Sequence, residues 1–312
     1  MPEQTPVPRE RFFVTCADGP TLAMQVRRAA GSRGDVLYVH GSTFGADLSV
    51  LYVLDGRSWA DALHDAGFTV WALDFAGYGK SERYPADSGR AVGRLAEVLP
   101  QLRRAVAAAR QRNGNRRLSL LGHSWGATVA AAYASGYRDE IDALVLFAPV
   151  TVRPSAAVAQ SPAASQPSHY PLTLWAQYRR FVEDVPRGQP QVFDEAHFES
   201  WGAVFLKTDS DAHLRTPPAV STPCGPQLDV RAMWSGHALY DPARIVAPTL
   251  LVRGEWDSVC DAGDARRLLD ALGGAVRVAA TIPGATHLMH LEARRGLLYN
   301  EVNKFLLERG GG

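Results

Sequence analysis

The chain has 312 residues, of which 46% are hydrophobic, and its formal net charge is +1. This length allows one large domain or a domain with an insertion. The near-neutral charge gives no electrostatic reason to expect a nucleic acid or an anionic membrane as a partner.

The expected compartment follows from the cysteines and from the start of the chain. Cys16, Cys224 and Cys260 lie far apart, which argues against a disulfide framework and indicates a reducing environment. Residues 1–10 contain three prolines and no apolar segment, so we expect a loose tail and not a secretory signal. No stretch reaches the roughly 18 apolar residues of a membrane span. A soluble, cytoplasmic protein is expected.

The first part of the chain shows β-prone runs and helical patterns in alternation. Residues 12–16 and 21–26 flank a turn-forming Asp-Gly-Pro, which predicts a hairpin. Residues 36–39 form a continuous apolar run, typical of a strand buried on both faces. Residues 51–66 favour a helix, although Gly56 weakens it, and residues 69–73 favour the next strand.

Further alternation predicts a parallel sheet covered on both sides. Apolar residues recur at helical spacing over 92–109, where Pro100 should kink or divide the helix and Asn113-Gly114 should end it. The segments that continue the alternation are strands at 118–121, 141–148, 249–252 and 276–282, and helices at 127–134, 262–272 and 291–307.

The alternation breaks between residues 151 and 240. Residues 151–168 lack periodicity, residues 216–226 are rich in proline, and residues 174–181 and 197–205 favour short helices. We interpret this region as an inserted, largely helical cap. The predicted organisation is a tail (1–10), an α/β core (11–150 and 241–312) and the cap (151–240).

A serine lies at the turn between a predicted strand and a predicted helix, in Gly122-His-Ser-Trp-Gly126. Glycines two positions before and after Ser124 let the helix pass close to the strand, so that the turn can hold the serine strained and exposed. A serine needs a base, a group that orients the base and oxyanion donors before it becomes a nucleophile. An ordinary glycine-rich turn is the alternative.

Two further strand ends carry residue types that complete such a site. Asp257 follows the strand at 249–252 and His287 follows the strand at 276–282. Functional groups of an open parallel sheet gather at the carboxyl ends of its strands, and the order Ser, Asp, His is that of α/β-hydrolases. Asp261 and Asp264 are rivals for the acid, but both fit the first turn of the next helix.

With these residues in place, the chain resembles α/β-hydrolase-fold enzymes, specifically capped, esterase-like serine hydrolases, over residues 12–307 apart from the cap. The motifs that carry the resemblance are His40-Gly41, Asp74-x-x-Gly77-x-Gly79-x-Ser81, Gly122-His-Ser-Trp-Gly126, Gly254-x-x-Asp257, and Gly284-x-x-His287 followed by His290-Leu-Glu292.

The resemblance implies a role for each matching residue. Ser124 is the nucleophile, His287 the general base and Asp257 the group that orients it. The backbone N–H groups of Trp125 and Ser42 bind the oxyanion, with Thr43 as an alternative to Ser42. No metal or other cofactor is expected, since His287 and His290 lack a third ligand.

Aromatic residues of the cap predict an apolar chamber over the site, or alternatively the contacts that hold the cap to the core. Arg179, Arg180 and Lys207 are candidates for meeting a substrate carboxylate, or are simply solvated. The candidates for lining the pocket are His40, Thr43, His123, Trp175, Tyr178, Trp201 and Trp234. His40 is also expected to order its own loop, and His123 to pack or to line the pocket.

These features predict a serine hydrolase that cleaves a carboxylic ester of a small to medium, largely apolar molecule through an acyl-enzyme. A thioesterase, a lactonase or a C–C bond hydrolase uses the same machinery. A small-molecule receptor with an intact triad is an alternative of another class. The sequence leaves the substrate and the oligomeric state open.

Overall fold

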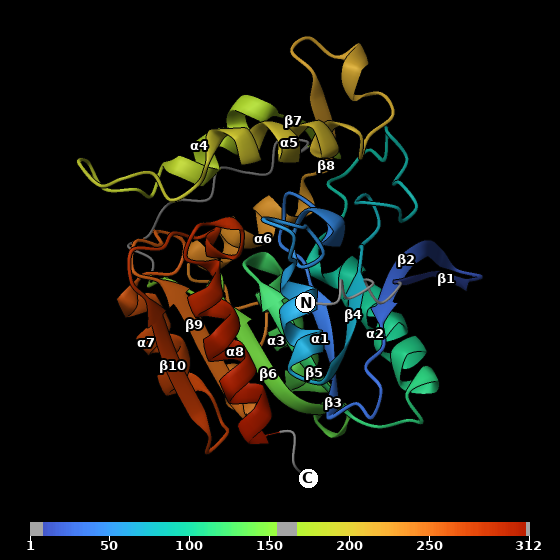
Figure 1. Ribbon diagram of the computed structural model, residues 1–312. Coiled ribbons are helices and arrows are strands. Elements are labelled where there is room, and N and C mark those ends of the chain that lie inside the picture. The colour runs from blue at the N-terminus through green and yellow to red at the C-terminus, as the bar shows by residue number, and fades with distance from the viewer. Residues whose placement is uncertain (1–8, 155–166, 310–312) are drawn as a thin grey trace, which may run out of the picture.

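The computed structural model describes residues 9–154 and 167–309 (Figure 1). An eight-stranded sheet has the order β1-β2-β4-β3-β5-β6-β9-β10. The six strands from β4 to β10 in this order run parallel, whereas β2 is antiparallel to both β1 and β4. The strands are β1 (Glu10–Cys16), β2 (Gly19–Arg27), β3 (Gly34–Val39), β4 (Phe68–Leu73), β5 (Leu118–His123), β6 (Ile141–Phe147), β9 (Thr249–Gly254) and β10 (Arg277–Ile282). The predicted hairpin and the mostly parallel sheet are confirmed.

Helices cover both faces of this sheet (Figure 1). One face packs against α2 (Leu95–Arg112), α3 (Trp125–Gly136) and α7 (Ala262–Ala271), and the other against α1 (Trp59–Asp65) and α8 (Arg295–Arg309). Within β3, Leu37 and Val39 join the first apolar cluster, and Val36 and Tyr38 join the second. The strand is continuously apolar because successive side chains point into opposite cores.

Two predicted helices differ from the observed ones. The helix expected over 51–66 is only α1, because Asp55 and Gly56 adopt positive φ angles of 51° and 77° in a turn. Ser58 then begins α1 with a capping box. The helix expected to kink or divide at Pro100 is the continuous α2. Pro100 and Ala96, whose carbonyl loses its helical partner, are both exposed, so water can bond that carbonyl.

Residues 167–240, here called the insertion, lie between β6 and β9 and include a layer drawn above the sheet in Figure 1. Short helices occur where two were predicted, but the antiparallel pair β7–β8 was not predicted. Trp201 packs in an apolar cluster with Phe44 and donates its Nε1–H to the Leu48 carbonyl at 3.0 Å. The insertion contains β7 (His169–Thr173), α4 (Leu174–Val182), α5 (Glu195–Leu206), the 3-10 helix Ala212–Leu214, β8 (Ala219–Pro223) and α6 (Gly225–Trp234).

Some expectations concern residues beyond those described. Residues 1–8 of the predicted tail and residues 155–166 of the predicted cap lie outside the described part of the chain, and Glu10 already belongs to β1. The division into core and cap therefore stays a prediction. Within the described residues, no helix is both long and apolar enough to cross a membrane.

Candidate active site

Ser124 occupies a strained turn between β5 and α3. Its backbone angles are φ 56° and ψ −124°, a conformation that non-glycine residues rarely adopt. A Cβ atom at Gly122 would lie 2.6 Å from the Cα atom of Ala127, and one at Gly126 would lie 2.2 Å from the carbonyl oxygen of His40. The two glycines are thus required by close packing of α3 against neighbouring backbone, and the turn presents the serine at the end of β5.

Two hydrogen bonds join Ser124 to His287 and Asp257. The Nε2 atom of His287 lies 2.9 Å from the Ser124 Oγ atom, and its Nδ1 atom lies 3.0 Å from Asp257 Oδ1. With the carboxylate accepting from Nδ1–H, Nε2 is free to accept the serine proton. The exposed fractions of the three residues are 8%, 4% and 3% in the order Ser124, His287, Asp257, so the chain of bonds is almost closed to solvent.

The acid is held by its own loop. Asp257 Oδ1 also accepts hydrogen bonds from the backbone N–H groups of Val259 (2.9 Å) and Cys260 (3.1 Å). The rival carboxylates have other partners: Asp261 caps α7, and buried Asp264 pairs with Arg153 at 2.7 Å. Only Asp257 of these three carboxylates bonds to the imidazole.

Two more buried histidines lie beside His287. The Nε2–H of His123 donates to the backbone carbonyl of His287 at 3.2 Å and so fixes the main chain of that residue. Burial lowers the pKa of His123 well below its usual value and that of His290 to about 3. Both rings are therefore neutral near pH 7. The described residues contain no group of three or more His, Cys, Asp or Glu side chains that could hold a metal ion.

The loop after β3 faces the serine. His40 donates from Nδ1 to the Gly41 carbonyl at 2.7 Å and accepts at Nε2 from the Phe75 N–H at 3.0 Å. Burial lowers the pKa of His40 to about 4, which keeps it neutral in this role. The carbonyl of Ser42 accepts from the Tyr78 hydroxyl at 2.7 Å. These bonds fix the loop that carries one predicted oxyanion donor.

The predicted oxyanion donors are not used elsewhere in the described structure. No hydrogen bond to another described residue engages the backbone N–H of Ser42, Thr43 or Trp125. Trp125 is the first residue of α3, and N–H groups in the first turn of a helix have no partner within the helix. A Cβ atom at Gly41 would lie 3.4 Å from the Cβ atom of Ser124, so the loop that carries Ser42 and Thr43 passes close to the serine, as their predicted role requires.

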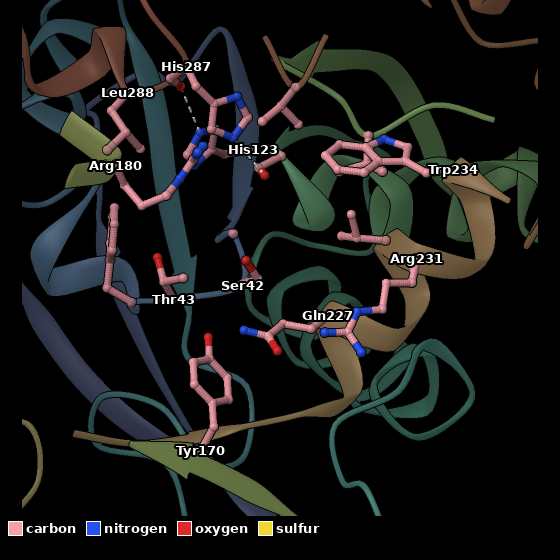
Figure 2. Close-up of a pocket in the computed structure, with 16 residues that line it drawn as sticks. Ser42, Thr43, His123, Tyr170, Arg180, Gln227, Arg231, Trp234, His287 and Leu288 are labelled. Carbon is pink, nitrogen blue, oxygen red and sulfur yellow. Dashed lines mark hydrogen bonds between the residues drawn. The ribbon is translucent and has the colours of Figure 1, made fainter. Parts of the chain in front are cut away.

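A cavity of about 340 Å³ adjoins Ser124 and His287 and has walls from two parts of the chain (Figure 2). The core contributes, among others, Thr43, Phe44, His123, Val150, Val259 and Leu288. The insertion contributes Tyr170, Arg180, Gln227, Val230, Arg231 and Trp234. The exposed lining is largely apolar; polar groups come from both sides, and both arginines come from the insertion.

The structure separates the predicted pocket candidates. Thr43, His123 and Trp234 line the cavity. The prediction is corrected for four others, which do not belong to its lining. His40 is buried behind its loop, Trp201 is buried between the insertion and the core, and Trp175, with 68% of its surface exposed, stacks on Tyr178 at the surface of the insertion.

No pattern in the sequence pointed to Gln227 and Arg231 as lining residues. They lie one turn apart on α6. This helix was not predicted, because the prolines of residues 216–226 argued against a helix there. Pro226 in fact occupies the first turn of α6, where a missing N–H costs nothing. A helix predicted from that position would have placed both side chains on one face.

Comparison with known proteins agrees with this geometry. Residues 32–294 match the family described as serine aminopeptidase, S33. The chain belongs to this S33 family of α/β-hydrolases. Both the predicted resemblance and the predicted fold class are confirmed.

Individual relatives are distant. The chain is 26% identical over 168 residues to a proline iminopeptidase of Saccharolobus solfataricus, a match that covers 54% of this chain and 44% of that protein. It thus spans less than half the length of this curated relative. Its fold is similar to a thioesterase domain from the curacin biosynthetic pathway (TM-score 0.67, 17% identity, covering 96% of this chain and 99% of that one). It is also similar to Est1E of Butyrivibrio proteoclasticus with bound ferulic acid (TM-score 0.62, 18% identity, 96% and 98% covered).

Proposed function

We propose that the protein is a carboxylic-ester hydrolase that works through an acyl-enzyme on Ser124. The observation that carries this proposal is the unbroken chain of hydrogen bonds from Ser124 through His287 to Asp257, at the wall of the cavity. Such a chain matches the arrangement that activates a serine hydroxyl for attack on a carbonyl carbon.

In the first half-reaction, Ser124 Oγ attacks the ester carbonyl while His287 Nε2 takes its proton. The resulting oxyanion accepts hydrogen bonds from the N–H of Trp125 and from that of Ser42 or Thr43. Each such donor contributes about 10²–10³ in turnover. As the tetrahedral intermediate collapses, His287 gives the proton to the leaving alcohol, and the acyl group stays on Ser124.

In the second half-reaction, water attacks the acyl-enzyme with His287 again as the base. The carboxylic acid leaves and Ser124 regains its proton. Asp257 holds the imidazole in the required tautomer and stabilises its charged form in both halves. No metal or other cofactor takes part in this scheme.

The cavity supports a small to medium acyl group. Its volume of about 340 Å³ lies at the lower end of ligand sites in proteins. Phe44, Val230 and Trp234 give it apolar walls. An acyl chain or an aromatic ring can pack there while its carbonyl carbon meets Ser124.

The charges of the lining favour an ester over an N-terminal peptide. An aminopeptidase has to bind the ammonium group of its substrate, which calls for a carboxylate in the pocket. The described lining contains Arg180 and Arg231 but no Asp or Glu. These two charges would repel an ammonium group.

The test uses p-nitrophenyl butyrate, Ser124→Ala and a fluorophosphonate probe. We expect a burst of nitrophenol from the unmodified protein and probe labelling of Ser124. Loss of the nucleophile should lower kcat by a factor on the order of 10⁶. Ser200→Ala, which removes an exposed hydroxyl on α5, is the matched control and should leave turnover unchanged.

Failure of the probe to label Ser124, together with unchanged turnover in Ser124→Ala, would contradict the proposal. Acyl thioesters and lactones, offered beside esters of the same acyl group, show which bond the protein prefers. An acyl-enzyme that forms with every substrate but hydrolyses extremely slowly would instead indicate a receptor.

A further inference from the structure

The polar groups of the cavity are distributed unevenly. Arg180 and Arg231 both line it from the insertion, and no Asp or Glu is among the described lining residues. Arg180 has a carboxylate partner, because it pairs with Glu183 on its own side of the insertion. The side chain of Arg231 makes no hydrogen bond or ion pair with another described residue. The cavity therefore carries one guanidinium whose charge has no direct partner among the residues that the structure describes.

Gln227 lies beside this guanidinium. The two residues are four positions apart on α6, so their side chains share one face of the helix. Figure 2 shows both leaving the α6 ribbon toward the cavity, with the Tyr170 hydroxyl also turned inward. Gln227 hydrogen-bonds to Tyr170, and burial raises the pKa of that tyrosine to about 12, so its hydroxyl stays neutral. This face offers N–H and O–H donors and a positive charge.

The opposite face of α6 is fixed to the catalytic core by Asp229. Its carboxylate is 1% exposed and accepts from the Leu95 N–H at 2.7 Å and from Arg94 Nε at 2.6 Å. It also accepts from the indole Nε1–H of Trp125 at 3.1 Å. Because Trp125 directly follows Ser124, the helix that carries Arg231 is tied to the segment that carries the nucleophile.

We propose that Arg231, assisted by Gln227, binds a carboxylate of the substrate at a fixed distance from Ser124. Resting on the hydrolase function proposed above, this names the substrate class as monoesters of dicarboxylic acids or acyl compounds of the same pattern. A guanidinium presents paired N–H groups that match a carboxylate. The apolar wall of Val230 and Trp234 packs against the carbon chain between the carboxylate and the scissile carbonyl.

The test compares two methyl esters of equal size that differ in charge, monomethyl adipate and methyl 6-amino-6-oxohexanoate. We expect kcat/KM to be about tenfold higher for the charged ester, mainly through a lower KM, as one partly exposed charged contact suggests. Arg231→Gln should bring the ratio of the two kcat/KM values close to one. Arg266→Gln, at an exposed position of α7 outside the cavity, is the matched control and should keep both activities and their ratio.

A binding measurement separates this proposal from the hydrolase proposal. Calorimetric titration of monomethyl adipate into Ser124→Ala should give a Kd about tenfold lower than in Ser124→Ala/Arg231→Gln, whether or not the ester is cleaved. Equal cleavage of both esters, or a preference that survives Arg231→Gln, would overturn the carboxylate site and leave the hydrolase intact. Tight, Arg231-dependent binding to the Ser124→Ala protein, together with no ester cleavage by the unmodified protein, would support the site while contradicting the hydrolase.

Discussion

The carboxyl edge of the sheet and the insertion contribute to the same cavity in opposite ways. At the sheet edge, Ser124, Asp257 and His287 are nearly inaccessible and each has hydrogen-bond partners. On the insertion, Arg231 is exposed and Trp234 has 36% of its surface exposed. The groups that we propose for bond making are buried and hydrogen-bonded, whereas those that we propose to meet the remote part of a substrate are accessible. Changes in the first region should therefore affect kcat, and changes in the second KM.

The strongest test of this contrast is Asp257→Asn in the core. The amide removes the charge and disturbs the tautomer of His287, so kcat should fall by a factor on the order of 10⁴ with little change in KM. Steady-state kinetics on the ester that the protein cleaves best provides the measurement. Asp270→Asn, an exposed change on α7, is the control. A change in KM with an unchanged kcat would contradict the proposed contrast between the core and the insertion.

The contact between the two regions is tested by Trp201→Ala. This indole is 0% exposed, packs against Phe44 and Phe205 and bonds to the Leu48 carbonyl. Its loss should reduce the free energy of unfolding by about 3–5 kcal/mol, as for other buried aromatic residues. Urea denaturation measures the loss. Trp175→Ala on the same insertion removes an indole that is 68% exposed and should have a far smaller effect. Equal losses would show that Trp201 does not anchor the insertion.

The smallest expected effect concerns Glu292, a core carboxylate beside the loop of His287. Its oxygens accept hydrogen bonds from the Thr286 N–H and hydroxyl. Burial raises its pKa from 4.5 to about 7. Between pH 4.5 and pH 7, the folded protein thus binds a proton that the unfolded chain has lost. This contribution to stability is full below pH 4.5 and is lost as the pH rises through 7.

Glu292→Gln should abolish the loss of stability that Glu292 causes as the pH rises. Relative to the unmodified protein, the variant should gain up to about 3 kcal/mol in unfolding free energy between pH 5 and pH 8. Urea denaturation at both pH values measures the difference, and Glu199→Gln, an exposed change on α5, should show no such trend. Comparison with the unmodified protein is essential, because burial lowers the pKa of His40 and His290 and makes acid destabilising for a separate reason. A pH-independent difference would show that Glu292 is ionised throughout.

The amino-acid sequence by itself determined the order of the core elements and the turn at Ser124. Both depend on local chemistry: apolar runs specify the strands, and the glycines at 122 and 126 are required wherever a helix passes this close to backbone. The local pattern predicted one helix over residues 51–66. The turn at Asp55 and Gly56 interrupts it, so the observed helix is shorter.

Only the tertiary structure decided how distant segments meet. Ser124 and His287 are 163 positions apart, and their contact depends on the pairing of β5, β6, β9 and β10. Which aromatic residues of the insertion face the cavity was likewise fixed by docking, so Trp234 lines it while Trp175 faces solvent. Arg231 acquired its place because Asp229 anchors the other face of α6. Propensity acts over a few residues, whereas burial and hydrogen-bond satisfaction are settled between segments that the sequence keeps far apart.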